Sequence, residues 1–347
     1  MKKVLWEEIA GQEHLKKFIE KAVEREETGH AYLFSGPEGS GKKTLALFFA
    51  RALNCEDMLQ RPCGQCPSCR GILNGTFPAL YLLKPQGGSL KIGQFREIKE
   101  SLFLLPLRGR KKVCIIYDAE LMTLPAANSL LKILEEPPKD AVFILLAARP
   151  WELPPTVLSR CIHFRLTPLS GEKMLQILGE KDLQKQPLTA REQQIVVALS
   201  GGNPGKAMEL ASRGGWEKKY EEALELIKII EEGPKEELFR KAEELAGKED
   251  LQDFLDLLLL IYRDRLLVKL DACSSVLVYT PENLNKNGEV ETFGGTDKII
   301  GEKEELKSSH FLEKICRAII QLQEEIRHNI NLRLAMEVLF LKMRGAV

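Results

Sequence analysis

The sequence predicts an α/β fold in its first half, a mostly parallel sheet with helices on both faces, and a purely helical second half. Within residues 1–165, apolar runs typical of buried strands alternate with segments of helical periodicity, and this alternation indicates a parallel sheet. A glycine-rich turn joins the first of these strands to a helix. After about residue 166 the strand patterns end and long amphipathic helices follow.

Each expected element depends on a local pattern. Helical segments repeat apolar side chains every three or four residues, as Leu15, Ile19 and Val23 do. The third strand instead carries continuous apolar residues from Val113 to Tyr117, as strands buried on both faces do. Strands are expected at 30–35, 77–83, 111–120, 141–148 and 162–166, and helices at 11–28, 45–53, 91–106 and 125–136.

Capping residues and prolines mark the ends of the helix at 125–136. Thr123 is placed to cap its start, with Pro125 in the first turn, where a missing N–H costs nothing. Pro137 marks its end, because the residue before a proline disfavours the helical conformation.

The second half divides into two expected helical domains. A small helical unit covers 166–212, and long amphipathic helices occupy 213–347. The segment 281–306 is polar and contains glycines, which predicts a loop between two of these helices. Together with the α/β domain at 1–165, the sequence therefore predicts three domains.

Composition indicates a globular, cytoplasmic protein with no membrane partner. The 347 residues include no apolar run near the roughly 18 to 20 residues that span a bilayer, and the N-terminal residues lack a signal-peptide core. Fifty basic and fifty acidic residues cancel. A stand-alone DNA-binding protein usually carries a basic excess, so neutrality disfavours that class.

A phosphate-binding loop is expected between the first strand and the following helix. Gly36, Gly39, Gly41 and Lys42 fit the spacing GxxxxGK in the strand–loop–helix context that gives this motif its specificity. The glycines let backbone N–H groups face phosphate oxygens, and the ammonium group of Lys42 would reach the outer phosphates. The alternative, an ordinary glycine turn, is disfavoured by that context.

The magnesium ligands that normally accompany this loop are missing. Lys43 follows Lys42 where a serine or threonine hydroxyl should coordinate the cation, and an ammonium group cannot do so. Thr44 comes one residue late, about 100° around the helix.

Asp118, at the end of the third strand, is followed by Ala119 instead of glutamate, so Glu120 is displaced by one position. The next strand ends in alanines, at Ala147 and Ala148, where a polar residue would lie near the outer phosphate. These losses, added to the missing magnesium ligand, predict a loop that could still hold ATP or ADP but does not hydrolyse it.

Four of the eight cysteines predict a metal site. Cys55, Cys63, Cys66 and Cys69 supply four thiols within 15 residues, and two-residue spacings let a tight loop surround an ion. Four sulfur ligands fill a tetrahedral zinc site and leave no position for water, so the expected zinc is structural. Four reduced thiols and an iron–sulfur cluster are the alternatives.

Ser159 and Arg160 precede the last strand. By spacing alone, Arg160 is more often a surface arginine than a functional one. The functional interpretation is an arginine finger that reaches a neighbouring subunit's nucleotide and stabilises charge on the transferred phosphoryl group.

Several stretches together resemble the bacterial clamp-loader family of DNA polymerase III, and within it the delta-prime branch. The resemblance spans nearly the whole chain. The matching stretches are EEIAGQEHLKKFIEKA, HAYLFSGPEGSGKKT, the Cys55–Cys69 cluster, AANSLLKILEEPP, LPPTVLSRCIHF and NINLRLAMEVLFLKM.

The resemblance implies an AAA+ P-loop domain at 1–165 with a zinc-binding insertion at 55–69, a helical lid at 166–212 and a helical collar at 213–347. It implies that Arg160 acts in trans, as a catalytic arginine finger beside Ser159. In the lid it places Lys206 where related motors carry an arginine that senses nucleotide.

The implied role is that of a clamp-loader subunit that does not hydrolyse ATP within the DNA polymerase III holoenzyme. Implied partners are gamma/tau and delta subunits in a hetero-pentameric ring, and, through that ring, the sliding clamp and primer-template DNA. The isolated chain is then expected to show no catalysis, although it belongs to a DNA-directed DNA polymerase complex. Two alternatives are an ATP-hydrolysing motor of the gamma/tau type and a zinc-containing DNA-binding protein that acts alone.

Overall fold

The computed structural model describes residues 9–103, 110–180, 188–248, 250–270, 308–328 and 330–345. The loop expected at 281–306 lies outside these residues. The chain divides into two compact units. The first comprises Met1–Lys173 and the short segment Asn203–Lys206, and the second comprises Met174–Gly202 and Ala207–Val347.

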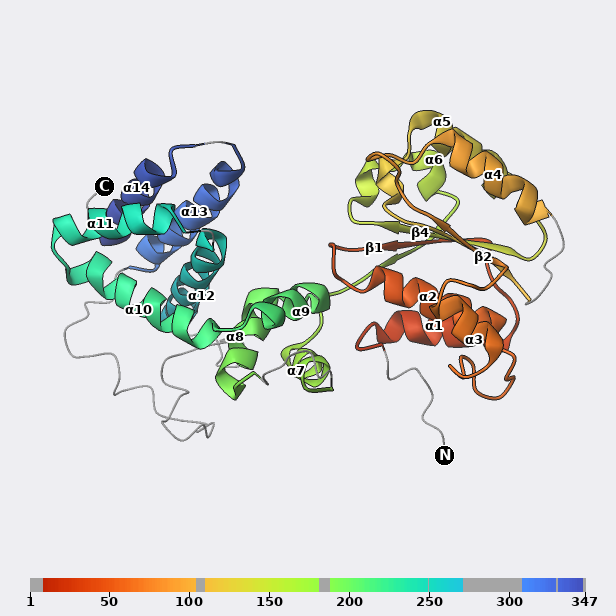
Figure 1. The fold of residues 1–347 in the computed structure, drawn as a ribbon, viewed down its shortest axis with the longest axis horizontal. Helices are drawn as coiled ribbons and strands as arrows, with labels where there is room; N and C mark the ends of the chain where they lie inside the picture. The colour runs from red at the N-terminus through yellow and green to blue at the C-terminus, as the bar shows by residue number, and fades with distance from the viewer. Residues whose placement is uncertain are drawn as a thin grey trace. The chain divides into compact units, whose positions relative to one another are not determined.

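A five-stranded sheet forms the centre of the first unit, in the order β2-β3-β4-β1-β5 (Figure 1). All four strand pairings are parallel, which confirms the predicted α/β class. The strands are β1 (Ala31–Ser35), β2 (Leu80–Leu83), β3 (Lys112–Ile116), β4 (Ala141–Ala147) and β5 (Ile162–Arg165).

Helices cover both faces of this sheet. They are α1 (Glu13–Glu24), α2 (Lys42–Asn54), α3 (Pro67–Leu73), α4 (Ile92–Phe103), α5 (Leu124–Glu135) and α6 (Pro155–Leu158), with short 3₁₀ turns η2 (Ala119–Leu121) and η3 (Pro150–Glu152). Successive side chains of a strand point to opposite faces. Helices α1, α2 and α3 lie on one face and α4, α5 and α6 on the other (Figure 1). Tyr32 and Phe34 therefore pack on the α1–α3 side, and Ala31 and Leu33 on the α4–α6 side.

Two local features of the first unit differ from the sequence prediction. The cysteine segment contains a helix, α3, whose N-cap is Cys66. Thr123 does occupy the N-cap position of α5, but its hydroxyl forms no capping bond. Instead it donates to the carbonyl oxygen of Leu90 at 3.2 Å, and so ties the start of α5 to the segment before α4.

The remaining described elements are helical, as the sequence predicts. They are α7 (Gly171–Glu180), α8 (Ala190–Ser200), α9 (Pro204–Arg213), α10 (Trp216–Glu232), α11 (Lys235–Ala246), α12 (Leu251–Lys269), α13 (Ser309–Glu325), η6 (Ile326–His328) and α14 (Leu332–Arg344). In the second unit α12 packs against α13, and α11 packs against α14. No helix in the described ranges is long and apolar enough to cross a membrane.

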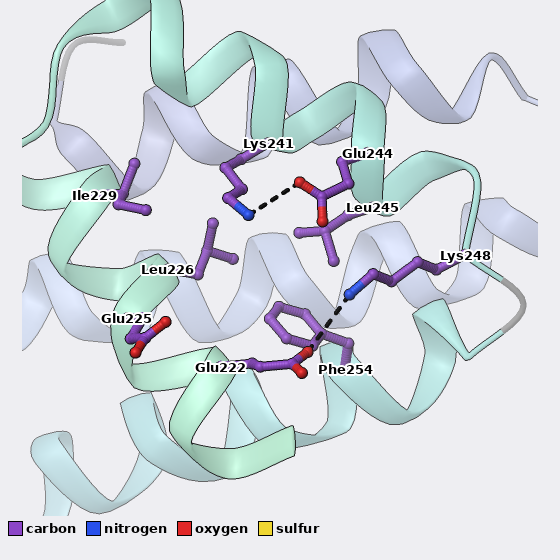
Figure 2. Close-up of a pocket in the computed structure, with 9 residues that line it drawn as sticks. All are labelled: Glu222, Glu225, Leu226, Ile229, Lys241, Glu244, Leu245, Lys248 and Phe254. Atoms are coloured by element: carbon purple, nitrogen blue, oxygen red, sulfur yellow. Dashed lines mark hydrogen bonds and ion pairs between the residues drawn. The ribbon is translucent and has the colours of Figure 1, made fainter. Parts of the chain in front are cut away.

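Apolar side chains hold α10, α11 and α12 together. Figure 2 shows Leu226, Leu245 and Phe254 meeting between these helices. Two ion pairs lie around this contact. Lys241 Nζ is 2.9 Å from Glu244 Oε2, and Lys248 Nζ is 3.5 Å from Glu222 Oε2. Partly exposed pairs of this kind contribute little to stability, so the apolar contacts carry the packing.

Candidate functional site

The phosphate loop, residues 36–42, connects β1 to α2 as the sequence predicts. It follows the carboxyl end of β1, which lies between β4 and β5 in the sheet. Gly39 and Gly41 have φ values of 79° and 93°, a region that favours glycine because other residues carry a Cβ atom. Gly41 is the N-cap of α2, so the helix begins directly at Lys42.

Lys42 folds back onto its own loop. Its Nζ donates hydrogen bonds to the carbonyl oxygens of Gly36, at 2.6 Å, and of Pro37, at 2.9 Å. Burial lowers the pKa of Lys42, and the nearby carboxylates of Glu120 and Asp118 oppose that shift. The Lys42 ammonium group, which would contact phosphate, is therefore hydrogen-bonded to carbonyl oxygens of the loop itself.

Lys43 and Thr44 lie on the first turn of α2, and both are exposed. Asp118 follows β3 with a left-handed φ of 46°, and it too is exposed. Burial, and secondly the neighbouring Glu120, raise the pKa of Asp118. The loop thus has carboxylates near Lys42, those of Glu120, Asp118 and Glu38, while the position after Lys42 carries a cation instead of a hydroxyl.

Glu120 has a structural contact. Its Oε1 accepts hydrogen bonds from the backbone N–H groups of Ala148, at 2.8 Å, and Arg149, at 3.1 Å. These bonds join the 3₁₀ turn after β3 to the end of β4. A carboxylate held by two N–H donors is fixed in place.

The four clustered cysteines lie together. Their Sγ atoms are all within 4.8 Å of one another. In a tetrahedral site with Zn–S bonds of about 2.3 Å, neighbouring sulfurs lie about 3.8 Å apart, so this group fits a metal ion. Three backbone N–H groups, those of Cys63, Cys66 and Cys69, point at sulfurs of the group at 3.3 Å.

The thiols of this group lie in unequal surroundings. Burial raises the pKa of Cys55 to about 11, and it raises the pKa of Cys69 as well. Burial also acts on Cys63, but hydrogen bonds from the backbone of Gln65 and Cys66 outweigh it and lower the pKa to about 7. Four such sulfurs can bind a metal ion as thiolates, and the thiol protons would be released when the ion binds.

The turn carrying Arg160 lies at the amino ends of the strands, whereas the phosphate loop lies at their carboxyl ends. β5 runs parallel to β1, with Tyr32 opposite Ile162, so residues before β5 lie at the amino end of β1. The phosphate loop follows the carboxyl end of β1. The two ends of a five-residue strand such as β1 lie about 13 Å apart.

Two acceptors hold the Arg160 guanidinium. It donates to the carbonyl oxygen of Thr156 at 3.0 Å and to Oε1 of Glu135 at 2.7 Å. The Arg160 side chain is 36% exposed and that of Glu135 51% exposed, so this pair is accessible from outside. Ser159 donates to the same Thr156 carbonyl at 3.1 Å, which stabilises the turn.

Residues from a distant part of the chain also meet the phosphate loop, and the sequence did not point to them. Asn203 Nδ2 donates to the carbonyl oxygen of Glu38 at 2.6 Å, and the Gly205 N–H donates to that of Gly39 at 2.9 Å. The sequence drew attention to this stretch only through Lys206. The Asn-Pro-Gly start of a helix was the available signal, but a cap motif does not identify its contact.

The family profile described as DNA polymerase III, delta subunit, matches residues 11–170. The delta' subunit of DNA polymerase III from Bacillus subtilis is 32% identical over 272 residues, which are 77% of this chain and 81% of that protein. The delta' subunit from Pseudomonas aeruginosa is 34% identical over 60% of this chain and 63% of its own length.

Tau and gamma-related subunits are also similar to this chain. The tau subunit from Bacillus subtilis is 32% identical over 58% of this chain but only 35% of that protein. A solved gamma subunit-related protein from Thermotoga maritima covers 96% of this chain and 98% of its own, at 19% identity and a TM-score of 0.42. That structural likeness is too low to bear on the family. The match to the Bacillus subtilis delta' subunit over most of both chains is what assigns it: this chain belongs to the DNA polymerase III delta' family of clamp-loader subunits.

Proposed function

We propose that this chain is a clamp-loader subunit that does not hydrolyse ATP and that donates Arg160 to the ATPase site of a neighbouring subunit. Family membership supports the clamp-loader role. The finer role of Arg160 depends on one geometric observation. Arg160 lies at the sheet edge opposite the chain's own phosphate loop and is partly exposed.

The topology favours action in trans for a simple reason. A side chain at the amino edge of a parallel sheet cannot reach a phosphate bound about 13 Å away at the carboxyl edge. Arg160 is nevertheless presented at a surface, with Glu135 as its ionic partner. A nucleotide that uses this guanidinium must therefore come from another subunit.

The chain's own loop supports the absence of hydrolysis. Magnesium normally takes a hydroxyl ligand directly after the loop lysine, and here Lys43 would repel the cation. Glu120 is held by backbone N–H groups of Ala148 and Arg149, so it is not free to activate water. We therefore place the useful chemistry of this chain at Arg160.

The proposal includes the assembly. The partners are gamma/tau and delta subunits in a hetero-pentameric ring in the cytoplasm, which brings this chain to the sliding clamp and to primer-template DNA. In this arrangement residues 166–212 form the lid and residues 213–347 form the collar that joins subunits. ATP or ADP, if bound at Lys42, would stay unhydrolysed.

The test is ATP turnover by a reconstituted ring in which only the site facing Arg160 can hydrolyse ATP. Arg160→Ala should lower turnover at that site by about 10³–10⁵, the range for arginine fingers. Arg149→Ala is the matched control, because Arg149 is another partly exposed arginine with a single carboxylate partner, Glu152. Equal turnover for wild type and Arg160→Ala would contradict the role in trans.

Cys55, Cys63, Cys66 and Cys69 are proposed to hold a structural zinc ion. The observation that supports this is the mutual approach of the four sulfurs, together with backbone N–H groups directed at them. All ligand positions of a tetrahedral ion would be filled by protein, which leaves no site for reaction. Metal analysis of the purified chain should find one zinc per chain, and a different metal or none would contradict it.

The alternative is a motor of the gamma/tau type, which the similarity to tau subunits favours. In that case Thr44 or Glu120 would have to restore the chemistry. DNA-stimulated ATP turnover by the purified chain alone would support the motor and contradict the present proposal. A DNA titration at low salt would likewise reveal a stand-alone DNA-binding protein.

A further inference from the structure

The phosphate loop has an unusual set of internal partners. Four consecutive carbonyl oxygens, those of residues 36 to 39, accept hydrogen bonds from the chain's own atoms. Lys42 Nζ serves the first two, and the segment Asn203–Lys206 serves the other two. The loop is thereby held from inside by Lys42 and from outside by a segment more than 160 residues away in sequence.

Close backbone packing reinforces the outer contact. A Cβ atom added to Gly205 would lie 2.5 Å from the Cα atom of Gly39, and one added to Gly39 would lie 2.6 Å from Oδ1 of Asn203. Both positions therefore require glycine for the contact to form. Asn203 also accepts a hydrogen bond from the Lys206 N–H through Oδ1, so its amide is oriented by the first turn of α9.

From these contacts we infer that Asn203 and Gly205 lock the phosphate loop in a closed conformation and thereby weaken its affinity for nucleotide. The lock fixes Glu38 and Gly39, the middle of the loop, while Lys42 bonds to the carbonyls of its first residues. A phosphate group can recruit the ammonium group only after these bonds break. Nucleotide thus binds only to the fraction of molecules in which the loop is open.

The consequence is a subunit whose loop is held in one conformation when no nucleotide is bound. In an ATP-dependent loop, bound phosphate supplies the partners that fix the backbone. Here the chain's own Asn203, Gly205 and Lys42 fix the backbone instead, by donating to its carbonyl oxygens. This inference goes beyond the proposed role of Arg160 and holds whether or not Arg160 acts in trans.

Two variants of the full chain release the lock by different means. Asn203→Ala removes the amide donor to Glu38 and adds no charge beside the phosphate loop. Gly205→Ala inserts a methyl group against Gly39. Gly93→Ala is the matched control, because a Cβ atom at Gly93 in α4 meets nothing within 4 Å.

Hydrogen exchange of the loop amides is the first measurement. The lock bonds are accepted by loop carbonyls, so their loss should act on the loop amides by letting the loop open more often, and exchange at residues 36–42 should rise by about two- to tenfold in both lock variants. The control, and the amides of β4 in every variant, should exchange at the wild-type rate. Wild-type exchange in either lock variant, or a rise that extends equally to β4, would overturn the lock.

Titration with ADP, without added magnesium, is the second measurement. If the lock competes with nucleotide, both lock variants should bind ADP about two- to tenfold more tightly than wild type, in proportion to the gain in open molecules. Affinity that is unchanged, weaker or still undetectable in variants with faster loop exchange would overturn the claim that the lock limits nucleotide binding.

Discussion

The phosphate loop and the turn that carries Arg160 lie at opposite ends of the strands of one sheet. They differ in how their polar groups are hydrogen-bonded. In the loop, donors of the same chain occupy the carbonyl oxygens of residues 36–39. In the turn, Arg160 is held by Thr156 and by Glu135, half of whose side chain is exposed. The loop is closed by internal bonds, whereas the arginine can exchange its carboxylate for another anion.

This difference matches the division of work expected in a ring of ATPases. A group that must meet a partner's phosphate has to give up its resting contact at low cost, and an exposed ion pair costs about 0 to 1 kcal/mol to break. A loop with a lysine where the magnesium-binding hydroxyl is expected can instead be stabilised by its own chain.

The largest effect is expected at Arg160. Arg160→Lys keeps the charge but loses the planar fork that contacts two phosphate oxygens at once. Turnover at the neighbouring site should lose most of the factor of about 10³–10⁵, or about 4–7 kcal/mol of barrier. This loss is measured as ATP turnover by rings in which only the site facing Arg160 can hydrolyse ATP. A lysine variant as active as wild type would show that Arg160 acts only through its charge.

The next effect concerns the metal site, which follows the far end of the helix that begins at Lys42. Cys66→Ser should remove zinc and lower the free energy of unfolding by about 4 kcal/mol, as loss of a structural metal does. Urea denaturation measures this loss. Because the phosphate loop has its own internal bonds, hydrogen exchange should rise at residues 55–73 much more than at residues 36–42.

Equal increases in those two segments would show that the loop depends on the metal site. Cys114→Ser is the matched control for zinc content, because Cys114 is a buried cysteine in β3 outside the cluster. Its zinc content should equal that of wild type.

A smaller effect is expected at Glu120. Glu120→Ala leaves the N–H groups of Ala148 and Arg149 without their carboxylate and should lower the free energy of unfolding by about 2 kcal/mol. Glu120→Gln keeps an oxygen acceptor and should cost less than half of that. If both variants are as stable as wild type in urea, Glu120 is not the structural anchor described here.

The smallest effect is expected at Glu135. Glu135→Ala removes one exposed ionic contact and should change the free energy of unfolding by less than about 1 kcal/mol. ATP turnover at the neighbouring site should survive, because the guanidinium is released and not lost. A collapse of turnover as severe as that of Arg160→Ala would show that Glu135 must stay bound during the reaction.

Much of the fold was predictable because it depends on local patterns. Continuous apolar residues identified β3 and β4, and the glycine spacing identified the loop before α2. The helix α3 was not predicted, because the short segment after Cys66 has too few residues to show a helical period. The contact of Thr123 with Leu90 was likewise invisible, since a capping residue looks the same whichever acceptor its hydroxyl finds.

For the candidate site too, residue types and short spacings were predictable, whereas contacts between distant residues were not. The four cysteines were predictable because metal ligands are read from residue type and spacing, and their sulfurs do lie together. The loss of the magnesium ligand was evident at Lys43. The structural contact of Glu120 and the pairing of Glu135 with Arg160 were not, because each joins residues more than 20 positions apart.

The sequence by itself determined the chemistry available to this protein: a loop with a lysine but no magnesium ligand, four thiols at metal-binding spacing, and an arginine before the last strand. It did so because residue types and short spacings are local properties of the chain. Only the tertiary structure decided that Arg160 and the phosphate loop lie at opposite edges of the sheet, through the parallel pairing of β1 with β5. It also decided that Asn203 and Gly205 close the loop, because hydrogen bonds between distant segments exist only once the chain has folded.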